Sequence, residues 1–594
     1  MHDLPASPIS PATQRMPSSS GALAYLSNGI VGLDLGWNPL VDHHAMVSTL
    51  RQAHAESGVE AQGNCPYPLD VVLIGQDGPV TWHTHTQHYD FACGELVSEG
   101  EFRDGTDHFP GTITTLCARS QPTIVLQEIR TERGLRAEFR CQPEPNAGTL
   151  TANALGGFRW TVPGGDYVGL AFDVRTVGTV IQQMTSVVPA SMSSGPEIQS
   201  IRLLSVALDR GFERLRRENR QAWDEIWQHR VEAPYEDGQP AVDAAFFYLN
   251  SSIHSSSPHA TGLLGLNPPT RYHNFWGHLF WDLEVHALPA LLHSQPHAAR
   301  ALLETRFRGL EAARRNAAMN GYRGAQYPWE GGITGEEQLP TTYLQNMHEQ
   351  HVSLGIALGF LRAAEAFDDP VFTRERAWPV VHAVAEWVTS RVTETTSGAS
   401  IRDTIGIDEA LHHHDDGVWT NASAILLLRA ASQLRANCGY GPEPAWESLA
   451  DRIVIPIRDH CLIPFPTWEP NTIPLCPDPL MAIFPLNFPV SEQVRQTSLA
   501  TLLPLAQATI GMPMHSPYHW RWAKMLGDEA LARHTFERGV LDFVFAPFNQ
   551  ISEFGASQTQ VLTRSGPYMA HCGAIVATSL DYARNRQSVL PPCN

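Results

Sequence analysis

The spacing of apolar residues changes near residue 198, and this change constrains the fold more than any other feature. Before it, short runs rich in Val, Ile and Leu, such as 70–74, 123–129 and 167–172, are separated by Gly, Pro and Asp. Such runs are typical of strands in an antiparallel β-sandwich. After it, apolar residues of 203–230 recur at helical spacing until Pro234, which predicts a linker helix.

Long helical patterns alternate with Gly- and Pro-rich loops from about residue 240 to 585. Roughly twelve such segments are found, which suits a double ring of helices. We expect helices at 298–319, 351–367, 380–392, 422–438 and 499–510. The predicted organisation is an α+β multidomain chain with a Ser- and Pro-rich disordered tail at 1–21, a β-sandwich domain at 22–197, a helical linker at 198–238 and a helical barrel at 239–594.

The charge of the chain limits its partners. The formal net charge of −20 repels nucleic acids and anionic membrane surfaces, so neither is expected as a partner. No run of eighteen or more apolar residues predicts a transmembrane span, and the first residues lack the apolar core of a secretory signal. A neutral small molecule is compatible with this charge. The oligomeric state stays open, with a homodimer as one alternative.

The cysteines and the single lysine exclude further classes of protein. Nine cysteines without a CxxC pair argue against a disulfide framework or a zinc ribbon and favour reduced thiols in the cytoplasm. The only lysine, Lys524, does not follow a glycine, so a Walker A phosphate loop is absent. The strong preference for arginine over lysine indicates a GC-rich, bacterial genome.

Two aromatic segments could bind a sugar. The first, 275–282, contains Trp276, His278, Trp281 and Asp282. Aromatic rings offer flat apolar faces, and a carboxylate accepts hydrogen bonds from hydroxyl groups. On composition alone, a buried aromatic cluster with a capping aspartate explains this segment equally well.

The second aromatic segment, 320–330, follows a helical pattern that we expect to end with Gly321 just beyond its last turn. It offers Trp329 and Glu330. An ordinary helix cap with a surface aromatic residue is the alternative explanation for this segment taken alone.

Two further segments carry candidate catalytic carboxylates. Glu409 lies in the segment 406–410, GIDEA, which precedes the run His412-His413-His414. Glu553 lies between apolar neighbours before a glycine-rich loop, where a raised pKa would suit a general base. A helix-end carboxylate is the alternative for Glu553. The histidine run does not predict a metal site, because consecutive side chains splay apart. We expect neither a metal nor an organic cofactor.

Together these segments resemble glycoside hydrolase family 65. The strongest part is 271–330, where FWGHLFWDLE and LETRFRGLEAARRNAAMNGYRGAQYPWE are close to the family patterns GHxFWDTE and RYRTLxxAxxNAxxNGYxGAxFPWE. Asn28-Gly29 resembles the family's early turn, and AWDEIW at 222–227 resembles its linker helix. The resemblance runs from about residue 28 to 584. It implies an antiparallel β-supersandwich, a linker helix and an (α/α)6 barrel.

The resemblance also implies roles for individual residues. By motif, Asp282 binds the glucose of the −1 subsite beside Trp281 and His278, and Trp329 and Glu330 line the same pocket. Trp276 is a further candidate for binding the sugar.

By motif, Glu409 matches the catalytic acid. The segment ISEFG at 551–555 resembles the hydrolase version of the family, which makes Glu553 the general base. An inverting glycosidase holds two such carboxyl groups roughly 6.5–9.5 Å apart. The implied activity is inverting hydrolysis of an α-glucoside, either a disaccharide or a glucosylated small molecule.

Several positions depart from the family pattern. Ile407 and Ala410 replace Pro and Tyr of the acid motif, Gly355 replaces an Asp, and 283–286 contains uncommon residues. Two alternatives therefore remain. One is an α-glucoside phosphorylase, although 563–566 lacks the Ser-rich phosphate loop of those enzymes. The other is a repurposed barrel that acts on a non-sugar metabolite.

Overall fold

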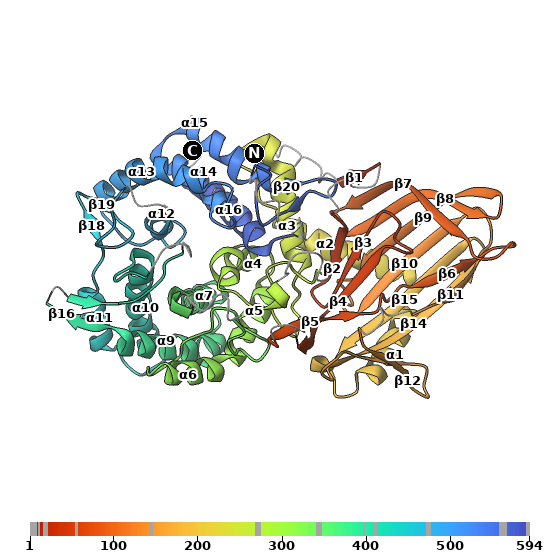
Figure 1. Ribbon diagram of the computed structural model, residues 1–594, viewed down its shortest axis with the longest axis horizontal. Helices are drawn as coiled ribbons and strands as arrows, with labels where there is room; N and C mark the ends of the chain where they lie inside the picture. Colours follow the sequence, from red (N-terminus) through yellow and green to blue (C-terminus); the bar gives the residue numbers. More distant parts are fainter. Residues whose placement is uncertain are drawn as a thin grey trace, which may run out of the picture.

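An antiparallel β-domain and a ring of helices lie side by side along the long axis of the molecule (Figure 1). The structure is a computed structural model, which describes residues 9, 12–15, 22–53, 58–141, 147–267, 275–339, 347–396, 398–407, 413–470, 477–557 and 567–589. The expected fold class, a β-supersandwich followed by linker helices and an (α/α)6 barrel, is confirmed. No described helix is both long enough and apolar enough to cross a bilayer.

The β-domain is built from two main sheets. Among the described residues, one sheet has the order β1-β7-β8-β9-β10-β15-β14-β13-β12 and the other β2-β3-β4-β5, while β6 pairs with β11. The strands are β1 (Ala12–Gln14), β2 (Ala24–Ser27), β3 (Val31–Leu35), β4 (His43–Ala53), β5 (Glu60–Cys65), β6 (Val71–Ile74), β7 (Thr81–Asp90), β8 (Glu95–Asp104), β9 (Asp107–Cys117), β10 (Ile124–Thr131), β11 (Arg136–Phe139), β12 (Thr149–Ala152), β13 (Phe158–Thr161), β14 (Tyr167–Val177) and β15 (Val180–Pro189).

Strand β7 shows how the sequence selects the buried face. Trp82 and Thr84 are buried, whereas His83 and His85 are exposed, as alternation in a strand requires. A register shift between Thr84 and Thr86 then changes the parity, so that Tyr89 also points inward. Strand β1, which pairs with β7, lies within the segment expected to be a disordered tail.

Two helices, rather than one, connect the domains. The pattern at 203–230 predicts a single helix, but α1 (Pro196–Arg210) and α2 (Phe212–Trp227) are separated by Gly211, whose φ is +79°. A helix cannot continue through that angle, and glycine reaches it without the steric cost of a Cβ atom.

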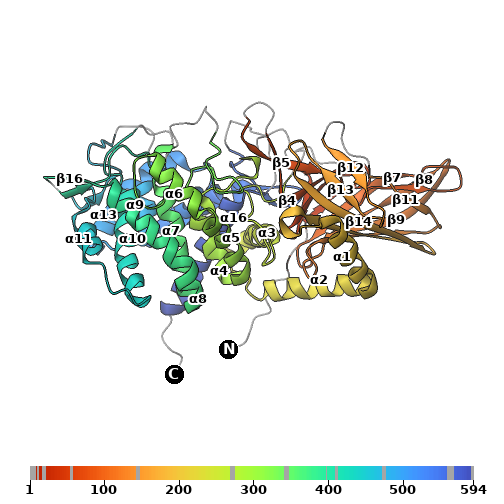
Figure 2. The same cartoon turned by 90° about the horizontal axis from the view of Figure 1, so that it is seen from below.

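Helix α2 is anchored to the β-domain along the lower side of the molecule (Figure 2). The buried carboxylate of Glu95 on β8 accepts hydrogen bonds from Arg216 at 2.6 Å and from Arg220 at 2.9 Å. The Trp227 indole N–H donates to the carbonyl oxygen of Phe91 at 3.0 Å. These contacts fix the linker to the sheet that precedes it.

The remaining helices form the ring seen in Figure 1. The helix expected at 298–319 is divided at Gly309, and a Cβ atom at this position would lie 3.2 Å from the Cα of Gly335 in a neighbouring loop. The helical elements are η1 (Ala190–Met192), η2 (Glu236–Gly238), α3 (Gln239–Ser251), η3 (Phe275–Gly277), η4 (Leu283–Ala287), α4 (Leu288–Ser294), α5 (Pro296–Arg308), α6 (Leu310–Met319), α7 (His351–Phe367), α8 (Pro370–Phe372), η6 (Thr373–Ala377), α9 (Trp378–Arg391), α10 (Val418–Asn437), α11 (Pro444–Arg452), α12 (Asp478–Ile483), α13 (Glu492–Ala506), η7 (Gln507–Thr509), η8 (Ser516–Tyr518), α14 (His519–Leu526), α15 (Glu529–Gly539), η9 (Leu541–Phe543) and α16 (Met569–Val589).

The barrel domain also contains short β-hairpins. They pair β16 (Thr393–Thr395) with β17 (Gly398–Ser400), β18 (Ile457–Arg458) with β19 (Cys461–Leu462), and β20 (Val544–Phe545) with β21 (Gln550–Ile551).

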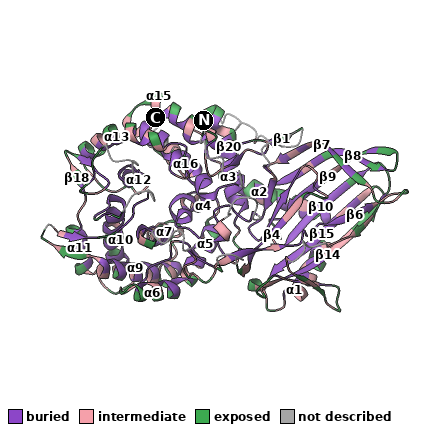
Figure 3. Cartoon of the chain, in the orientation of Figure 1, coloured by how far each residue is buried: buried purple, intermediate pink, exposed green. Residues whose placement is uncertain are grey.

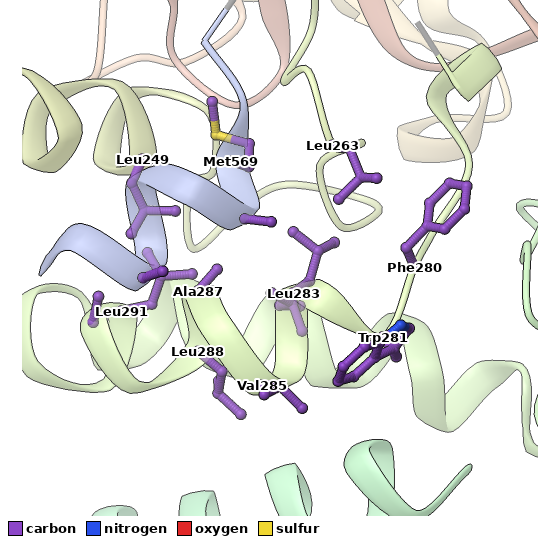
Figure 4. Close-up of a cluster of buried hydrophobic side chains, with 14 of the residues drawn as sticks. Leu249, Leu263, Phe280, Trp281, Leu283, Val285, Ala287, Leu288, Leu291 and Met569 are labelled. Atoms are coloured by element: carbon purple, nitrogen blue, oxygen red, sulfur yellow. The ribbon is translucent and has the colours of Figure 1, made fainter. Parts of the chain in front are cut away.

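Buried residues fill the interior of both domains, and exposed residues lie on the outer faces of the helices and strands (Figure 3). Figure 4 shows one part of this core, where Leu249 of α3, Leu288 of α4 and Met569 of α16 come together. The backbone N–H of Met569 also donates to the carbonyl oxygen of Leu263 at 2.6 Å. Burial of such side chains stabilises the fold by about 1.5–3 kcal/mol each. The core thus holds α16, near the end of the chain, against the first helices of the barrel.

Candidate functional site

The loop that precedes Asp282 has a strained backbone. Phe275, Trp276 and Gly277 have φ angles of +51°, +47° and +76°. A left-handed conformation costs a residue with a Cβ atom roughly 1–2 kcal/mol, whereas glycine tolerates it. Such strain persists where the surrounding structure fixes it, most often at functional sites. The Trp276 ring lies 6.1 Å from the ring of His278, between centroids.

Trp281 is buried just before the π-helical turn η4, and Figure 4 shows its side chain beside Val285 and Leu283 of that turn. Its ring meets that of His351 edge-on, with centroids 4.6 Å apart. A Cβ atom on Gly355 would lie 3.6 Å from Cε3 of Trp281 and 3.2 Å from Cγ2 of Val285. The glycine in place of the family's Asp therefore leaves space that Val285 and Trp281 fill.

Asp282 lies at the start of the π-helical turn Leu283–Ala287, and only 2% of it is exposed. π-Turns inside helices occur frequently at functional sites. Burial raises the pKa of the Tyr518 hydroxyl, and the carboxyl of Asp282 raises it further. Tyr518 Oη lies 2.7 Å from Nδ1 of His286. Asp282 thus belongs to a buried polar layer that no local sequence pattern indicates.

The structure brings His278 and Glu330 together. Nδ1 of His278 lies 2.7 Å from Oε1 of Glu330, and Nε2 lies 2.7 Å from the carbonyl oxygen of Glu60. A carbonyl oxygen can only accept, so Nε2 carries a proton. A neutral His278 must then accept at Nδ1, which requires a protonated Glu330 as the donor. The pair therefore holds one further proton between Nδ1 and the carboxyl group.

Burial favours the neutral form of both partners. It raises the pKa of Glu330 to about 8 and lowers the pKa of His278 to about 4. Both shifts agree with a carboxylic acid that donates to a neutral imidazole. The pair links the loop 275–282 to the loop 329–330.

Glu337 is a partly buried carboxylate beside the Trp329 loop that no sequence pattern predicts. Its carboxyl oxygens accept backbone N–H groups from Trp329 at 2.8 Å, Glu330 at 3.0 Å and Leu339 at 3.2 Å. Burial raises the pKa of Glu337 to about 7, although these donors favour the ionised form. The side chain fixes the turn that presents Trp329. The adjacent Glu336-Glu337 pair carries no sequence signal for this role.

The Trp329 ring has partners on two sides. Its indole N–H donates to Oε2 of Glu349 at 2.8 Å, and its ring meets that of Phe280 edge-on at 5.1 Å. Glu349 is buried and lies two residues before the start of α7. A small polar pocket lies here, lined by Asn316, Gln326, Tyr327, Trp329, Glu337, Met347, Glu349, Gln350 and Ser353.

Glu553 lies on a loop that is pinned at several points. Beside it, the N–H of Ser552 donates to the carbonyl oxygen of Phe543 at 2.9 Å, and the N–H of Gly555 donates to that of Gly511 at 3.2 Å. Glu553 itself is partly exposed. Its backbone position is therefore well defined, while part of its side chain remains accessible to solvent.

A row of aromatic rings connects this loop to the Trp329 loop. The N–H of Tyr568 donates to the carbonyl oxygen of Ile551 at 2.7 Å. The ring centroid of Tyr568 lies 6.3 Å from that of Phe275, which lies 5.2 Å from that of Phe280. Phe280 in turn contacts Trp329. The segments that carry Glu553, Asp282 and Glu330 are thus joined through this row.

Glu409 lies outside the described residues, as does the segment 563–566. The first part of the acid motif is described and is anchored by Asp478, a buried carboxylate. The N–H of Ile407 donates to Oδ1 of Asp478 at 3.2 Å. The distance between Glu409 and Glu553 therefore remains a prediction.

Histidines are unusually common in the interior of the barrel. Burial lowers the pKa of each of these groups, so they are neutral near pH 7. Electrostatic interaction with His515 lowers the pKa of His351, His519 and His571 further. We refer to this set as the barrel histidines: His286, His351, His515, His519 and His571.

A β-supersandwich is joined by linker helices to an (α/α)6 barrel, and the barrel loops carry buried carboxylates and aromatic rings. Residues 247–459 match the model of the glycosyl hydrolase family 65 central catalytic domain. The matched residues include 271–330, whose motifs predict a resemblance to this family.

Similar proteins of this family include hydrolases and phosphorylases. The chain is 30% identical over 275 residues to the kojibiose hydrolase of Flavobacterium johnsoniae, covering 46% of this chain and 39% of that protein. It is 28% identical over 299 residues to the protein-glucosylgalactosylhydroxylysine glucosidase of Gallus gallus, covering 48% and 42%. It is 32% identical over 231 residues to the kojibiose phosphorylase of Caldanaerobacter subterraneus, covering 36% and 29%. The chain thus matches less than half the length of these relatives.

Two solved structures share the fold. A putative kojibiose phosphorylase from the human microbiome superposes with a TM-score of 0.76 at 14% identity, covering 95% of this chain and 87% of that one. A bacterial glucoamylase complexed with acarbose superposes with a TM-score of 0.52 at 9% identity, covering 97% and 98%. These matches span both domains and support the architecture.

Proposed function

We propose that this protein hydrolyses an α-glucoside with inversion at the anomeric carbon, and that its substrate is a disaccharide or a glucosylated small molecule. The observation that carries this proposal is Glu553. It is a partly exposed carboxylate on a pinned loop, connected by the aromatic row to the loops of Asp282 and Trp329. The hydrolases among the relatives support the same reaction.

In this mechanism Glu409 is the general acid and donates its proton to the glycosidic oxygen as the bond to the anomeric carbon breaks. Glu553 accepts a proton from water on the opposite face of the ring, and the water oxygen forms the new bond to that carbon. The products are β-glucose and the free alcohol. Glu409 ends ionised and Glu553 protonated, and exchange with solvent restores both.

The remaining predicted residues bind the sugar or position the loops. Asp282 accepts charge-assisted hydrogen bonds from ring hydroxyl groups. The partly exposed Trp276 and Trp329 offer apolar faces, while the buried Trp281 packs against His351 in the core. His278 and Glu330 are bonded to each other, so their proposed contribution includes holding the two aromatic loops together. No metal and no organic cofactor enter this mechanism.

Phosphorolysis is the second candidate, because kojibiose phosphorylases are among the relatives. Both reactions need the acid, whereas the nucleophile distinguishes them. Water needs a base, but phosphate is already anionic, and an ionised Glu553 would repel it. This repulsion favours hydrolysis. If the protein cleaves no α-glucoside, we propose instead that the barrel acts on a non-sugar metabolite.

The deciding experiment incubates the protein with kojibiose, trehalose, maltose, nigerose and isomaltose, each with and without phosphate. We expect free glucose at a rate that does not depend on phosphate, with the β-anomer appearing first by NMR. Glucose 1-phosphate would establish phosphorolysis instead. α-Glucose as the first product would contradict inversion.

Glu553→Ala should reduce hydrolysis by about 10²–10⁴-fold. Azide should restore part of the turnover by occupying the vacated space. Glu99→Ala changes an exposed carboxylate of the β-domain and should leave turnover unaffected. If Glu553→Ala retained full hydrolysis, another residue would have to be the base.

A cytoplasmic location is also part of this proposal. The seven cysteines within the described residues are all free thiols, which supports a reducing environment.

A further inference from the structure

Three side chains from separate segments converge on the surface of the barrel. His413 Nδ1 lies 2.6 Å from Oδ1 of Asp403, and His348 Nδ1 lies 3.4 Å from Oδ2 of the same carboxylate. The two imidazole ring centroids are 4.2 Å apart. One donor atom from each residue lies within 4.8 Å of the other two.

Backbone contacts hold these residues in place. The N–H of Ile405 donates to the carbonyl oxygen of His348 at 3.0 Å, which joins the segment before α7 to the segment of Asp403. Thr404 and His414 exchange two backbone hydrogen bonds of 2.9 Å. The cluster is therefore arranged by the backbone and not by flexible side chains alone.

Asp403 has a left-handed backbone with a φ of +54°. Aspartate is among the few residue types that adopt this region with moderate cost. Its N–H donates to Oδ1 of Asp415 at 3.0 Å, which places a second carboxylate beside the cluster. This conformation directs one carboxylate toward two imidazole rings.

The neighbouring His414 shows why the histidine run is not itself a site. His414 is buried and stacks on Phe465, with ring centroids 4.5 Å apart, whereas His413 is exposed. Consecutive side chains do splay apart, as expected. His413 instead lies beside His348 and Asp403, which come from other segments. Protein metal sites are usually assembled from distant segments in this way.

We propose that His348, Asp403 and His413 form a binding site for a divalent first-row transition metal such as Zn²⁺. Imidazole nitrogen and carboxylate oxygen are preferred ligands of this class, whereas Ca²⁺ and Mg²⁺ favour oxygen alone. Metal–ligand bonds of about 2.0–2.2 Å place tetrahedral donor atoms about 3.3–3.6 Å apart. One donor atom from each of the three residues lies within 4.8 Å of the other two, so the ligands reach this range with shifts on the order of 1 Å.

Because His413 is exposed and His348 partly exposed, water completes the coordination sphere. The ion would connect His348, which lies before α7, to Asp403 and His413. None of the three ligands has a role in the proposed hydrolysis. The metal site therefore stands independently of the proposed function.

The test uses the full chain without a histidine tag, titrated with Zn²⁺ in competition with a chromophoric chelator. Co²⁺ serves as a spectroscopic probe of the ligand set. We expect one site per chain, and at least tenfold weaker binding in His413→Gln and in Asp403→Asn. The thermal midpoint of the wild-type protein should rise with Zn²⁺, and that of each variant should not.

The matched control is a double variant, His83→Gln with His85→Gln. These exposed rings on β7 lie 5.5 Å apart, similar to the cluster but outside it. The control should bind Zn²⁺ like the wild type. Equal binding by His413→Gln and wild type, loss of binding in the control, or no binding at one equivalent would each overturn the proposal.

Discussion

Replacing Glu330 with glutamine tests the proton in the buried pair. A glutamine amide can donate to Nδ1 of His278 as the carboxylic acid does, but it does not titrate. In the wild type, the raised pKa of about 8 means that the folded state keeps a proton that the unfolded state, with an ordinary pKa of 4.5, releases. Stability from this group is therefore complete below pH 4.5 and is lost as the pH rises toward 8.

The size of the effect follows from that pKa. Each pH unit between 4.5 and 8 costs the wild type about 1.4 kcal/mol, which amounts to an upper limit on the order of 5 kcal/mol over the full range. Glu330→Gln avoids this cost. The variant should match the wild type within about 1 kcal/mol near pH 5 and exceed its stability near pH 8.

The assay is the thermal midpoint of both proteins in steps from pH 5 to pH 8. We expect the difference, variant minus wild type, to grow by on the order of 2 °C per pH unit. Glu99→Gln, an exposed carboxyl on β8, is the control and should give no trend. A difference that is flat or that shrinks with pH would mean that Glu330 is ionised in the folded protein, and the assignment of the proton would be wrong.

Three further predictions concern binding, stability and packing. Asp282→Asn should lower kcat/KM by about 10- to 100-fold while the circular dichroism spectrum is unchanged; unaltered kinetics would contradict its role in the −1 subsite. The barrel histidines are neutral when folded and become protonated on unfolding below about pH 6.5, so stability should fall as the pH drops from 6.5 toward 4, by up to about 1.4 kcal/mol per pH unit for each group; denaturant midpoints that do not change with pH would refute this. Gly324→Ala should destabilise the protein by about 2–4 kcal/mol, because its φ is +77° and a Cβ atom would lie 2.1 Å from the carbonyl oxygen of Ala383. Gly321→Ala, at a similar φ of +82° in open space, should cost only about 1 kcal/mol, and equal losses in the two variants would exclude the close approach as the cause.

The sequence by itself determined the order of the parts and the resemblance to a known family. Alternating apolar residues bury one face of a strand, and apolar residues at helical spacing bury one face of a helix. Both patterns are local, so the sequence alone shows that strands precede helices in this chain. Helix α7 has the bounds that its pattern predicts, and Gly321 takes the positive φ expected beyond a helix end. The motifs of 271–330 indicated the resemblance because many residues match in order, and they lie within the residues 247–459 that match the family model.

Only the tertiary structure decided how the site residues are paired. Trp329 donates to Glu349 and Glu330 bonds to His278, and the partners lie 20 and 52 positions apart in the chain. Such contacts depend on how distant helices pack, which no local spacing records. The breaks at Gly211 and Gly309 are also features that the apolar spacing did not predict. Both positions continue a helical apolar pattern, but the backbone of Gly211 takes a φ of +79°, and a neighbouring loop approaches Gly309 closely.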